Sequence, residues 1–400
     1  MRKVELGYLK IGEKAKQYVQ KVLDSNRLST GPFITKFEKG FAQAHNCKKA
    51  IMCNSGTSAL QIALAALKET HDWKDGDEVL VPAVTFVATS NIVLQNQMVP
   101  VFVDVKPDTY GIDPVQLKKH LTPKTRAIIP VHLFGLPCDM DEIMSFAQQH
   151  KLQILEDSCE TMFVQYKNKK VGSFGALSCF STYAAHLLVT GVGGLVTTND
   201  TSLATTCRSI MAHGRDAIYL SIDDDDHLKS DAAWTQMIQR RFSFVRMGYS
   251  HRATELEGAL GLAALEEKDS MIQARQKNGR YLIEKLTPLQ EHLQLPVVPG
   301  DREHAFMMFP VVVKGKIQRD HLCRYLEERG IETRYMMPVI NQPFYQKIMG
   351  DLESSYPIAK RINGSGFYIG CHQGLHQEDL DRVVEVFAEY CQSAKELSRT

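Results

Sequence analysis

The sequence predicts an α/β protein with a mostly parallel sheet in a large domain and a smaller C-terminal α+β domain. A chain of 400 residues with 44% hydrophobic content can bury a large core and form two structural lobes. Between residues 45 and 200, short apolar runs alternate with helical stretches, which is typical of parallel strands covered by helices. A proline-free helical stretch at 254–286 is long enough to bridge two lobes. We therefore expect a large domain at 1–265, including an N-terminal arm, and a small domain at 266–400.

The individual elements follow from the same patterns. In the large domain, strands are expected at 78–82, 101–104, 127–132 and 152–157, because each run is short and apolar. Helices are expected at 57–68 and 140–150, where apolar residues recur at helical spacing. The same criteria predict a strand at 305–313 and helices at 319–329 and 379–393 in the small domain. The polar segment 216–245, with four aspartates at 223–226, is expected to be a surface insertion, with a substrate-covering loop as the alternative.

Composition narrows the class of partner. The net charge is +1 and the charges are interleaved, so neither a nucleic-acid nor an anionic-membrane partner is expected. The chain has neither an apolar leader nor a run of roughly 18 apolar residues, so we expect a cytoplasmic protein that acts on a small molecule. The nine cysteines lack short paired spacings, so neither a disulfide framework nor a metal site is expected.

Small and hydroxyl residues at 54–60 could bind a phosphate group. Gly56 would let the backbone approach closely, and the amides and hydroxyls of Thr57 and Ser58 could hold phosphate oxygens. The hydroxyl of Ser181 could add another contact. The alternative is an ordinary capped helix N-terminus.

Two further residues could serve a pyridine cofactor that carries such a phosphate. Asp157, at the end of a predicted strand, could pair with the ring nitrogen and keep it protonated. A strand-terminal Asp is otherwise often a helix cap. Phe86 could stack on the ring face, although a lone Phe at such a position is more often part of the core.

Together these residues follow the order found in a known superfamily. The chain resembles the sugar aminotransferase/dehydratase branch of the fold-type I PLP-dependent (aspartate aminotransferase) superfamily, where PLP is pyridoxal 5'-phosphate. The resemblance covers nearly the whole chain and rests on Gly56, Thr57, Phe86, 131–135, Glu156, Asp157, Ser181, His186, Gly193 and Gly194. It implies a fold-type I PLP-dependent transferase that forms a homodimer with shared active sites and acts on keto or aldehydo sugars.

The resemblance also implies roles for particular residues. Thr57, Ser58 and Ser181 would bind the phosphate, Phe86 would stack on the ring, and Asp157 would pair with its nitrogen. Gly56 and Glu160 would also contact the cofactor. Ser250 of the partner subunit would reach the phosphate, at a position where family members commonly carry Asn.

Three positions depart from the ordinary aminotransferase pattern. His186 stands where the Schiff-base lysine is expected, Val192 replaces an acidic residue, and Glu160 stands where Gln or His is common. His186 and Glu160 resemble the sugar 3-dehydratases, which use pyridoxamine 5'-phosphate (PMP) and a histidine base. No cysteine lies between Cys207 and Cys323, so the iron-sulfur cluster of some dehydratases is not expected.

These departures leave three functional interpretations. In the first, glutamate donates its amino group to the cofactor, His186 moves the proton, and the amino group passes to a sugar. The sequence favours this sugar aminotransferase because it needs only one proton relay. The alternatives are a PMP-dependent sugar 3-dehydratase and a degenerate binding protein. A role in bacterial cell-surface polysaccharide or lipopolysaccharide synthesis follows from the resemblance alone. His132 and Arg252 are expected to be structural rather than catalytic.

Overall fold

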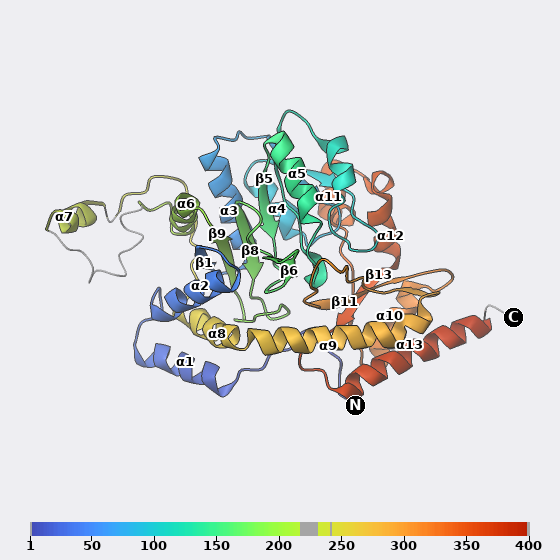
Figure 1. The fold of residues 1–400 in the computed structure, drawn as a ribbon. Coiled ribbons are helices and arrows are strands. Elements are labelled where there is room, and N and C mark those ends of the chain that lie inside the picture. The colour runs from blue at the N-terminus through green and yellow to red at the C-terminus, as the bar shows by residue number, and fades with distance from the viewer. Residues whose placement is uncertain (1, 217–230, 241, 398–400) are drawn as a thin grey trace.

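A seven-stranded sheet forms the centre of the molecule. The structure is a computed structural model that describes residues 2–216, 231–240 and 242–397 (Figure 1). From one edge to the other, the strands of the large sheet are β1 (Lys49–Cys53), β9 (Gly194–Thr198), β8 (Leu177–Ser181), β5 (Gln153–Asp157), β4 (Thr125–Ile128), β2 (Glu78–Pro82) and β3 (Val99–Val103). Within this sheet, β9 alone runs against its neighbours. The predicted mostly parallel sheet is confirmed.

Helices cover both faces of this sheet, which explains why its strands are apolar runs rather than alternating ones. The helices of this part are α3 (Gly56–Thr70), α4 (Ala88–Gln95), α5 (Met140–His150) and α6 (Thr201–Met211). Helix α3 packs on β8 and β9, and α5 packs on β5. The short strands β6 (Gln165–Tyr166) and β7 (Lys169–Lys170) form a separate hairpin.

Two N-terminal helices pack against the helix that leads to the C-terminal part. Helices α1 (Glu13–Asp24) and α2 (Pro32–Ala44) both contact α8 (Glu255–Glu266). A Cβ on Gly258 would lie 2.8 Å from Ile34, and one on Gly261 would lie 2.6 Å from Phe37, so both glycines allow α2 to approach closely. Helix α9 (Lys268–Leu286) follows and packs on the C-terminal helix α13 (Gln377–Leu397) (Figure 1).

The C-terminal part has the predicted α+β composition. Its four-stranded antiparallel sheet has the order β10 (Leu293–Gln294), β11 (Met308–Val313), β13 (Gly366–Gly370) and β12 (Thr333–Tyr335). Its other helices are α10 (Arg319–Glu328), α11 (Pro343–Met349) and α12 (Pro357–Ser365). A hydrophobic cluster beneath this sheet also contains Val4, whose backbone pairs with Ile331. The domain division at 265–266 stays a prediction.

Several predicted elements differ from the observed ones. The helical stretch predicted at 254–286 consists of two helices, because Glu267 has φ −100° and ψ 4° and separates α8 from α9. The strand predicted at 127–132 ends at Ile128, since Pro130 has no N–H to donate to a ladder. The strand predicted at 305–313 begins only at Met308, because the backbone of Phe306 turns with φ 46°.

Helix α7 (Asp231–Arg240) projects from the body of the molecule (Figure 1). The aspartates at 223–226 lie outside the described residues, so the two interpretations of the segment 216–245 stay open. Within the described part of the chain, no helix is long and apolar enough to cross a membrane. Over the same residues, no group of three His, Cys, Asp or Glu side chains could hold a metal ion.

Candidate active site

The N-terminus of α3 and the end of β8 form a narrow cradle. The Ser55 side chain caps α3 by accepting a hydrogen bond from the Ser58 N–H at 3.0 Å. A Cβ on Gly56 would lie 2.7 Å from the Cβ of Ser181, so only glycine leaves this space open. Thr57 is exposed on the first turn. Because the first N–H groups of a helix lack partners within it, this cradle can hold an anion such as a phosphate.

Asp157 is a buried carboxylate at the end of β5. Its hydrogen-bond partners are both neutral: the Thr89 hydroxyl donates at 2.8 Å, and the Cys159 N–H donates at 3.2 Å. Burial raises the pKa of Asp157, and these two hydrogen bonds offset the effect only in part. A nearby cation would favour the ionised carboxylate. This environment therefore fits the protonated ring nitrogen of a pyridine cofactor.

Phe86 lies on a turn that is tied to this carboxylate. The side chain is 51% exposed, so it is not part of the core. Its neighbour Thr85 is buried and hydrogen-bonds Thr89 at 2.8 Å between hydroxyl oxygens. Since Thr89 also donates to Asp157, the turn that carries Phe86 is connected to the end of β5. An exposed ring in this place can stack on a planar ligand.

Glu160 lies three residues beyond Asp157, and its surroundings favour the neutral acid. Burial raises the pKa of Glu160 to about 7, the Phe134 N–H lowers it, and the Asp157 charge raises it. The Phe134 N–H donates to Oε2 at 2.8 Å, and Phe134 holds the left-handed φ of 56°. Oε1 is therefore the oxygen that can carry the proton.

His186 lies in the loop between β8 and β9, close to the cradle. Its Nδ1 donates a hydrogen bond to the Ser181 carbonyl oxygen at 3.3 Å, which leaves the lone pair on Nε2. Burial lowers the pKa of His186 to about 4, and the charge of the Arg275 guanidinium acts in the same direction. The imidazole is therefore neutral at pH 7, and its Nε2 can accept a proton.

The loop that carries His186 is held at both of its ends. The Thr182 and Thr190 hydroxyls hydrogen-bond each other at 2.6 Å, and the Thr190 hydroxyl also donates to the Val192 carbonyl oxygen at 2.6 Å. Gly193 has φ 150°, and a Cβ there would collide with the Thr182 hydroxyl, so this position requires glycine. The loop is therefore closed tightly although it contains no regular structure.

Ser250 lies on an exposed segment at one side of the sheet. Its backbone pairs with Ala212, and the carbonyl oxygen of the following His251 accepts a hydrogen bond from the Asn54 N–H at 2.8 Å. Nearby, Arg252 is exposed and pairs through its backbone with Cys53. The large apolar side chains just before Ser250 are exposed: Phe242, Phe244, Val245 and Met247. The contact of Ser250 with a phosphate stays a prediction.

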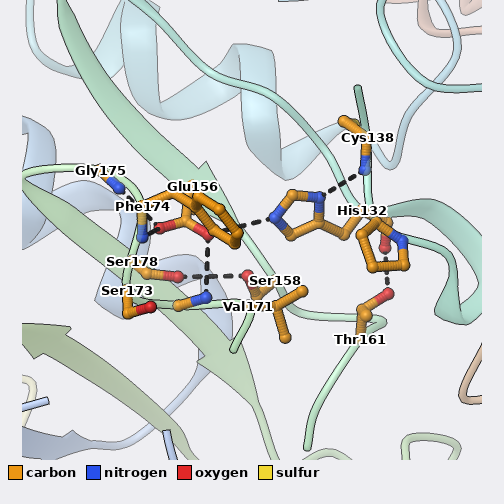
Figure 2. A network of polar contacts seen from close by, with 12 residues as sticks. His132, Cys138, Glu156, Ser158, Thr161, Val171, Ser173, Phe174, Gly175 and Ser178 are labelled. Carbon is orange, nitrogen blue, oxygen red and sulfur yellow. Dashed lines mark hydrogen bonds and ion pairs between the residues drawn. The ribbon is translucent and has the colours of Figure 1, made fainter. Parts of the chain in front are cut away.

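A buried polar network around His132 and Glu156 supports the end of β5 (Figure 2). It lies on the face of β5 opposite to the Asp157 side chain. The Cys138 N–H donates to His132 Nδ1 at 3.1 Å, so His132 Nε2 carries the proton and donates to Glu156 Oε2 at 3.2 Å. Glu156 also accepts hydrogen bonds at 2.7–2.8 Å from the backbone N–H groups of Gly172, Phe174 and Gly175. Burial alone would raise the pKa of Glu156, but the hydrogen bond from His132 and these amides hold it below its usual value.

This network places His132 away from the cofactor side of the sheet. Because side chains alternate along a strand, Glu156 and Asp157 point to opposite faces. The backbone N–H of His132 donates to the Asp157 carbonyl oxygen at 3.0 Å. This bond fixes the end of β5 without involving the Asp157 carboxylate. The expectation that His132 is structural is consistent with this position.

Sequence reasoning does not reveal the groups that hold these candidates in place. Thr89 is missed although it lies three residues after Phe86, which is the spacing of neighbours on one helical turn. The amide of Phe134 cannot be found in this way, because its role depends on a backbone angle and not on the residue type. The Thr182–Thr190 pair joins two residues across a loop whose path the sequence does not reveal.

Comparison with known proteins assigns the family. The chain matches the DegT/DnrJ/EryC1/StrS aminotransferase family over residues 9–388. It belongs to this family. It is 35% identical to GDP-perosamine synthase from Caulobacter vibrioides, over 92% of this chain and 93% of that protein. It is 31% identical to GDP-4-keto-6-deoxy-D-mannose 3-dehydratase from Yersinia pseudotuberculosis, over 93% of this chain and 94% of that protein.

A solved structure confirms the fold of this DegT/DnrJ/EryC1/StrS family member. A GDP-4-keto-6-deoxymannose-3-dehydratase variant with bound GDP-perosamine superposes with a TM-score of 0.87 at 28% identity, over 96% of this chain and 99% of that chain. The predicted superfamily and the fold-type I architecture are therefore confirmed. The relatives include 3-dehydratases and proteins of spore coat polysaccharide and lipopolysaccharide biosynthesis. This chain is an enzyme of the same family, either a sugar aminotransferase or a 3-dehydratase.

Proposed function

We propose that this chain is a PLP/PMP-dependent sugar-modifying enzyme that uses glutamate as amino donor and His186 as proton-transfer base. The observation that carries this proposal is the neutral His186 imidazole, whose Nε2 lone pair lies in the loop beside the phosphate cradle. When bound, PLP supplies an electron sink that stabilises negative charge on a neighbouring carbon. The protein must therefore hold the cofactor and move the proton.

The residues of the site fit this cofactor, PLP or PMP, which is the cofactor of the family. Gly56, Thr57, Ser58 and Ser181 would hold the phosphate in the cradle that a Cβ at position 56 would fill. Asp157 would pair with the ring nitrogen, because it is buried and its hydrogen-bond partners are neutral. Phe86 would stack on the ring, and Glu160 would contact the cofactor through its carboxyl group.

The imidazole of His186 cannot form the covalent link that a lysine forms with PLP. The cofactor would therefore be held only by noncovalent contacts, while Nε2 would accept the proton from the α-carbon of glutamate and deliver it to the cofactor carbon that receives the amino group. A base in this role typically contributes about 10²–10⁴-fold to the rate. Borohydride treatment of the PLP-loaded protein should leave the peptide that contains His186 without added mass. A mass increase on that peptide would contradict the assignment.

The second half of the reaction, on the sugar, has two candidate outcomes. Amino transfer reuses the same proton relay and is the outcome that the sequence favours. Two observations instead support a sugar 3-dehydratase. Without a lysine, an amino sugar cannot leave the cofactor by lysine exchange, and Glu160 offers a second proton near pH 7 for an expelled hydroxyl group. We therefore prefer the dehydratase and keep the aminotransferase as the second candidate.

Product analysis with labelled glutamate distinguishes the two candidates. The protein would be incubated with PLP, ¹⁵N-glutamate and a panel of nucleotide-linked 4-keto sugars, because the named relatives act on GDP-linked sugars. We expect a sugar that has lost one hydroxyl group, with the label released as ammonium. A sugar that retains ¹⁵N would establish the aminotransferase instead. The absence of both products, together with no PMP formation, would favour a degenerate binding protein.

We also propose that the active enzyme is a homodimer with shared active sites. The four exposed apolar side chains at 242, 244, 245 and 247 form the kind of surface that a partner usually covers. Ser250 closely follows this surface, so a second subunit docked there would bring its own copy near a cradle. Light scattering of the purified protein should give twice the chain mass of 45.1 kDa. A monomer that turns over at full rate would contradict the proposal.

A further inference from the structure

An N-terminal segment connects the small sheet to the loop that carries His186. We call residues 4–8 the N-terminal strap. The Val4 N–H donates to the Gly330 carbonyl oxygen at 2.8 Å, and the Glu332 N–H donates to the Val4 carbonyl oxygen at 2.9 Å. The Leu6 N–H donates to a Glu332 carboxylate oxygen at 3.1 Å. These contacts attach the strap to the C-terminal part, just before β12.

The other side of the strap is held with little free space. His372 hydrogen-bonds the Glu5 carbonyl oxygen at 3.1 Å through Nε2, and its ring stacks on Tyr8 with the centroids 5.4 Å apart. A Cβ on Gly370 would collide with the Glu5 carbonyl oxygen, and one on Gly374 would collide with the Tyr8 ring. The strap therefore cannot shift relative to the C-terminal part without breaking several contacts.

At Gly7 the strap lies against the residues that precede His186. A Cβ on Gly7 would lie 3.2 Å from the Ala185 Cα and 3.4 Å from the Ala184 carbonyl oxygen. The first of these separations is shorter than a relaxed carbon–carbon contact, so any larger side chain must push the loop away. Gly7 thus lets two backbones approach more closely than other residues allow.

The position of the His186 imidazole depends strongly on its backbone. Within the described residues, its side chain makes one hydrogen bond, the 3.3 Å contact with the Ser181 carbonyl oxygen, and one edge-on contact with the Tyr183 ring. A lysine at this position would be fixed by its covalent bond to PLP, whereas an imidazole must be placed by the surrounding protein. The backbone directly before the imidazole is the part of the loop that Gly7 supports.

We propose that the N-terminal strap positions His186 and that Gly7 is a positioning residue for proton transfer. The proposal rests on the proposed role of His186 as the base. Because the strap is attached to the C-terminal part, it also couples the position of that part to the position of the base. Displacing a reacting group by about 1 Å can cost about 10²-fold in rate, so a shift of a few tenths of an ångström should cost about 10-fold.

The test compares Gly7→Ala and Gly7→Val with the control Gly12→Ala. Gly12 lies in the same arm, but a Cβ there would meet only the Glu267 carboxylate, at 3.9 Å. Hydrogen–deuterium exchange of the cofactor-free protein would measure how readily the loop at 183–192 opens. The single-turnover rate of conversion of PLP to PMP by glutamate would measure proton transfer by the base, and equilibrium dialysis would measure the affinity for PLP.

We expect Gly7→Val to speed exchange at 183–192 and to slow the glutamate step by about 10-fold, with a smaller effect for Gly7→Ala. The affinity for PLP should stay within about 2-fold, because the residues that would hold its phosphate lie outside this loop segment. Gly12→Ala should change none of these quantities. Unchanged exchange or an unchanged rate in Gly7→Val would overturn the proposal. So would faster exchange throughout the chain, because it would show only a loss of stability.

A second variant separates this proposal from the proposed function. His186→Ala should abolish the glutamate step. If His186→Ala keeps the full rate, His186 is not the base and the proposed function fails. If His186→Ala loses the step while Gly7→Val leaves the rate unchanged, the function stands and the positioning role is wrong.

Discussion

At the scale of single residues, the site combines a neutral base and a neutral acid. Burial lowers the pKa of His186 to about 4 and raises the pKa of Glu160 to about 7. The same physical cause acts in opposite directions, because burial disfavours the charged form of each group. Near pH 6, His186 can therefore accept a proton while Glu160 still holds one. Pairs of groups with separated pKa values are typical of acid–base sites.

Replacing Glu160 should change how the reaction depends on pH. In the wild type, the rate should fall as pH rises through about 7, because Glu160 then loses its proton. On the acid side the rate should hold until the pH approaches 4, because His186 stays neutral down to about that value. Glu160→Gln cannot deprotonate, so it should lack the decline near pH 7. The pH profile of kcat with glutamate and a sugar substrate measures both the decline on the alkaline side and the decline on the acid side.

The control for this variant is Glu13→Gln. Glu13 carries an exposed carboxylate at the start of α1, where it pairs with Lys16 on the surface. The substitution makes the same chemical change as Glu160→Gln but lies outside the candidate site, so its pH profile should equal that of the wild type. A decline near pH 7 that persists in Glu160→Gln would show that another group titrates there.

At the scale of elements, the loop between β8 and β9 depends on two threonines. The Thr190 hydroxyl bonds both the Thr182 hydroxyl and the Val192 carbonyl oxygen, each at 2.6 Å. Both threonines are buried, so removing the Thr190 hydroxyl leaves the buried Thr182 hydroxyl without this partner and also removes the hydrogen bond to the Val192 carbonyl oxygen. The loop shape thus rests on a small number of polar contacts.

Thr190→Val should destabilise the protein by about 1–3 kcal/mol, because the new side chain has a similar shape but no hydroxyl. Urea unfolding of the cofactor-free protein measures this change. Thr205→Val is the matched control, since the Thr205 hydroxyl bonds the Thr201 carbonyl oxygen on an exposed helix surface. We expect the control to lie within about 0.5 kcal/mol of the wild type. Equal unfolding curves for both variants would contradict this account of the loop.

The sequence is sufficient for elements whose residues share one simple pattern. Helix α5 has the predicted bounds, because its apolar spacing and its flanking residues agree. Strand β5 is predicted to within one residue, because a short apolar run between polar turns is unambiguous. The break at Glu267 is not predictable, because neither a glycine nor a proline marks it. It results from α8 packing on α2 while α9 packs on α13, which is a property of the tertiary structure.

The candidate site is likewise only partly predictable from the sequence. Gly56, Ser181 and Asp157 can be named from the sequence, because residue type and position at an element end are visible there. The arrangement of Glu160 and His186 is not visible, because it depends on the Phe134 amide and on the Ser181 carbonyl oxygen. Backbone groups of this kind occur throughout the chain, so the sequence does not show which ones are used.

At the scale of the whole molecule, buried histidines should make the fold sensitive to acid. Burial lowers the pKa of His45 to about 4, and its ring is enclosed by Phe41, Phe163 and Phe180. In the unfolded chain His45 should titrate near the ordinary value of about 6.5. Its contribution to stability is therefore fully present above about pH 6.5 and is lost as the pH falls towards 4, because the unfolded state binds the proton first.

At a pH of about 4.5 the expected loss for His45 is about 3 kcal/mol, because this pH lies roughly 2 units below the unfolded-state pKa of about 6.5 and each unit corresponds to about 1.4 kcal/mol. Free energies of unfolding would be measured near neutral pH and at a pH of about 4.5, for the wild type and for His45→Phe. The variant cannot take up a proton at this position, so its stability should fall less between the two conditions. An equal fall in both proteins would show that His45 does not contribute to acid sensitivity.

The pairing of the first strand has a consequence for synthesis of the chain. β1 lies at the edge of the large sheet, and its neighbour in that sheet is β9, which begins at Gly194. Val4 pairs with Ile331, and Arg2 contacts Asp379. Because the chain is synthesised from its N-terminus onward, residues near the start remain unpaired until their partners are made much later. The emerging chain therefore carries an unpaired apolar strand for much of translation, and the support of the His186 loop is completed only when the C-terminal part has been released.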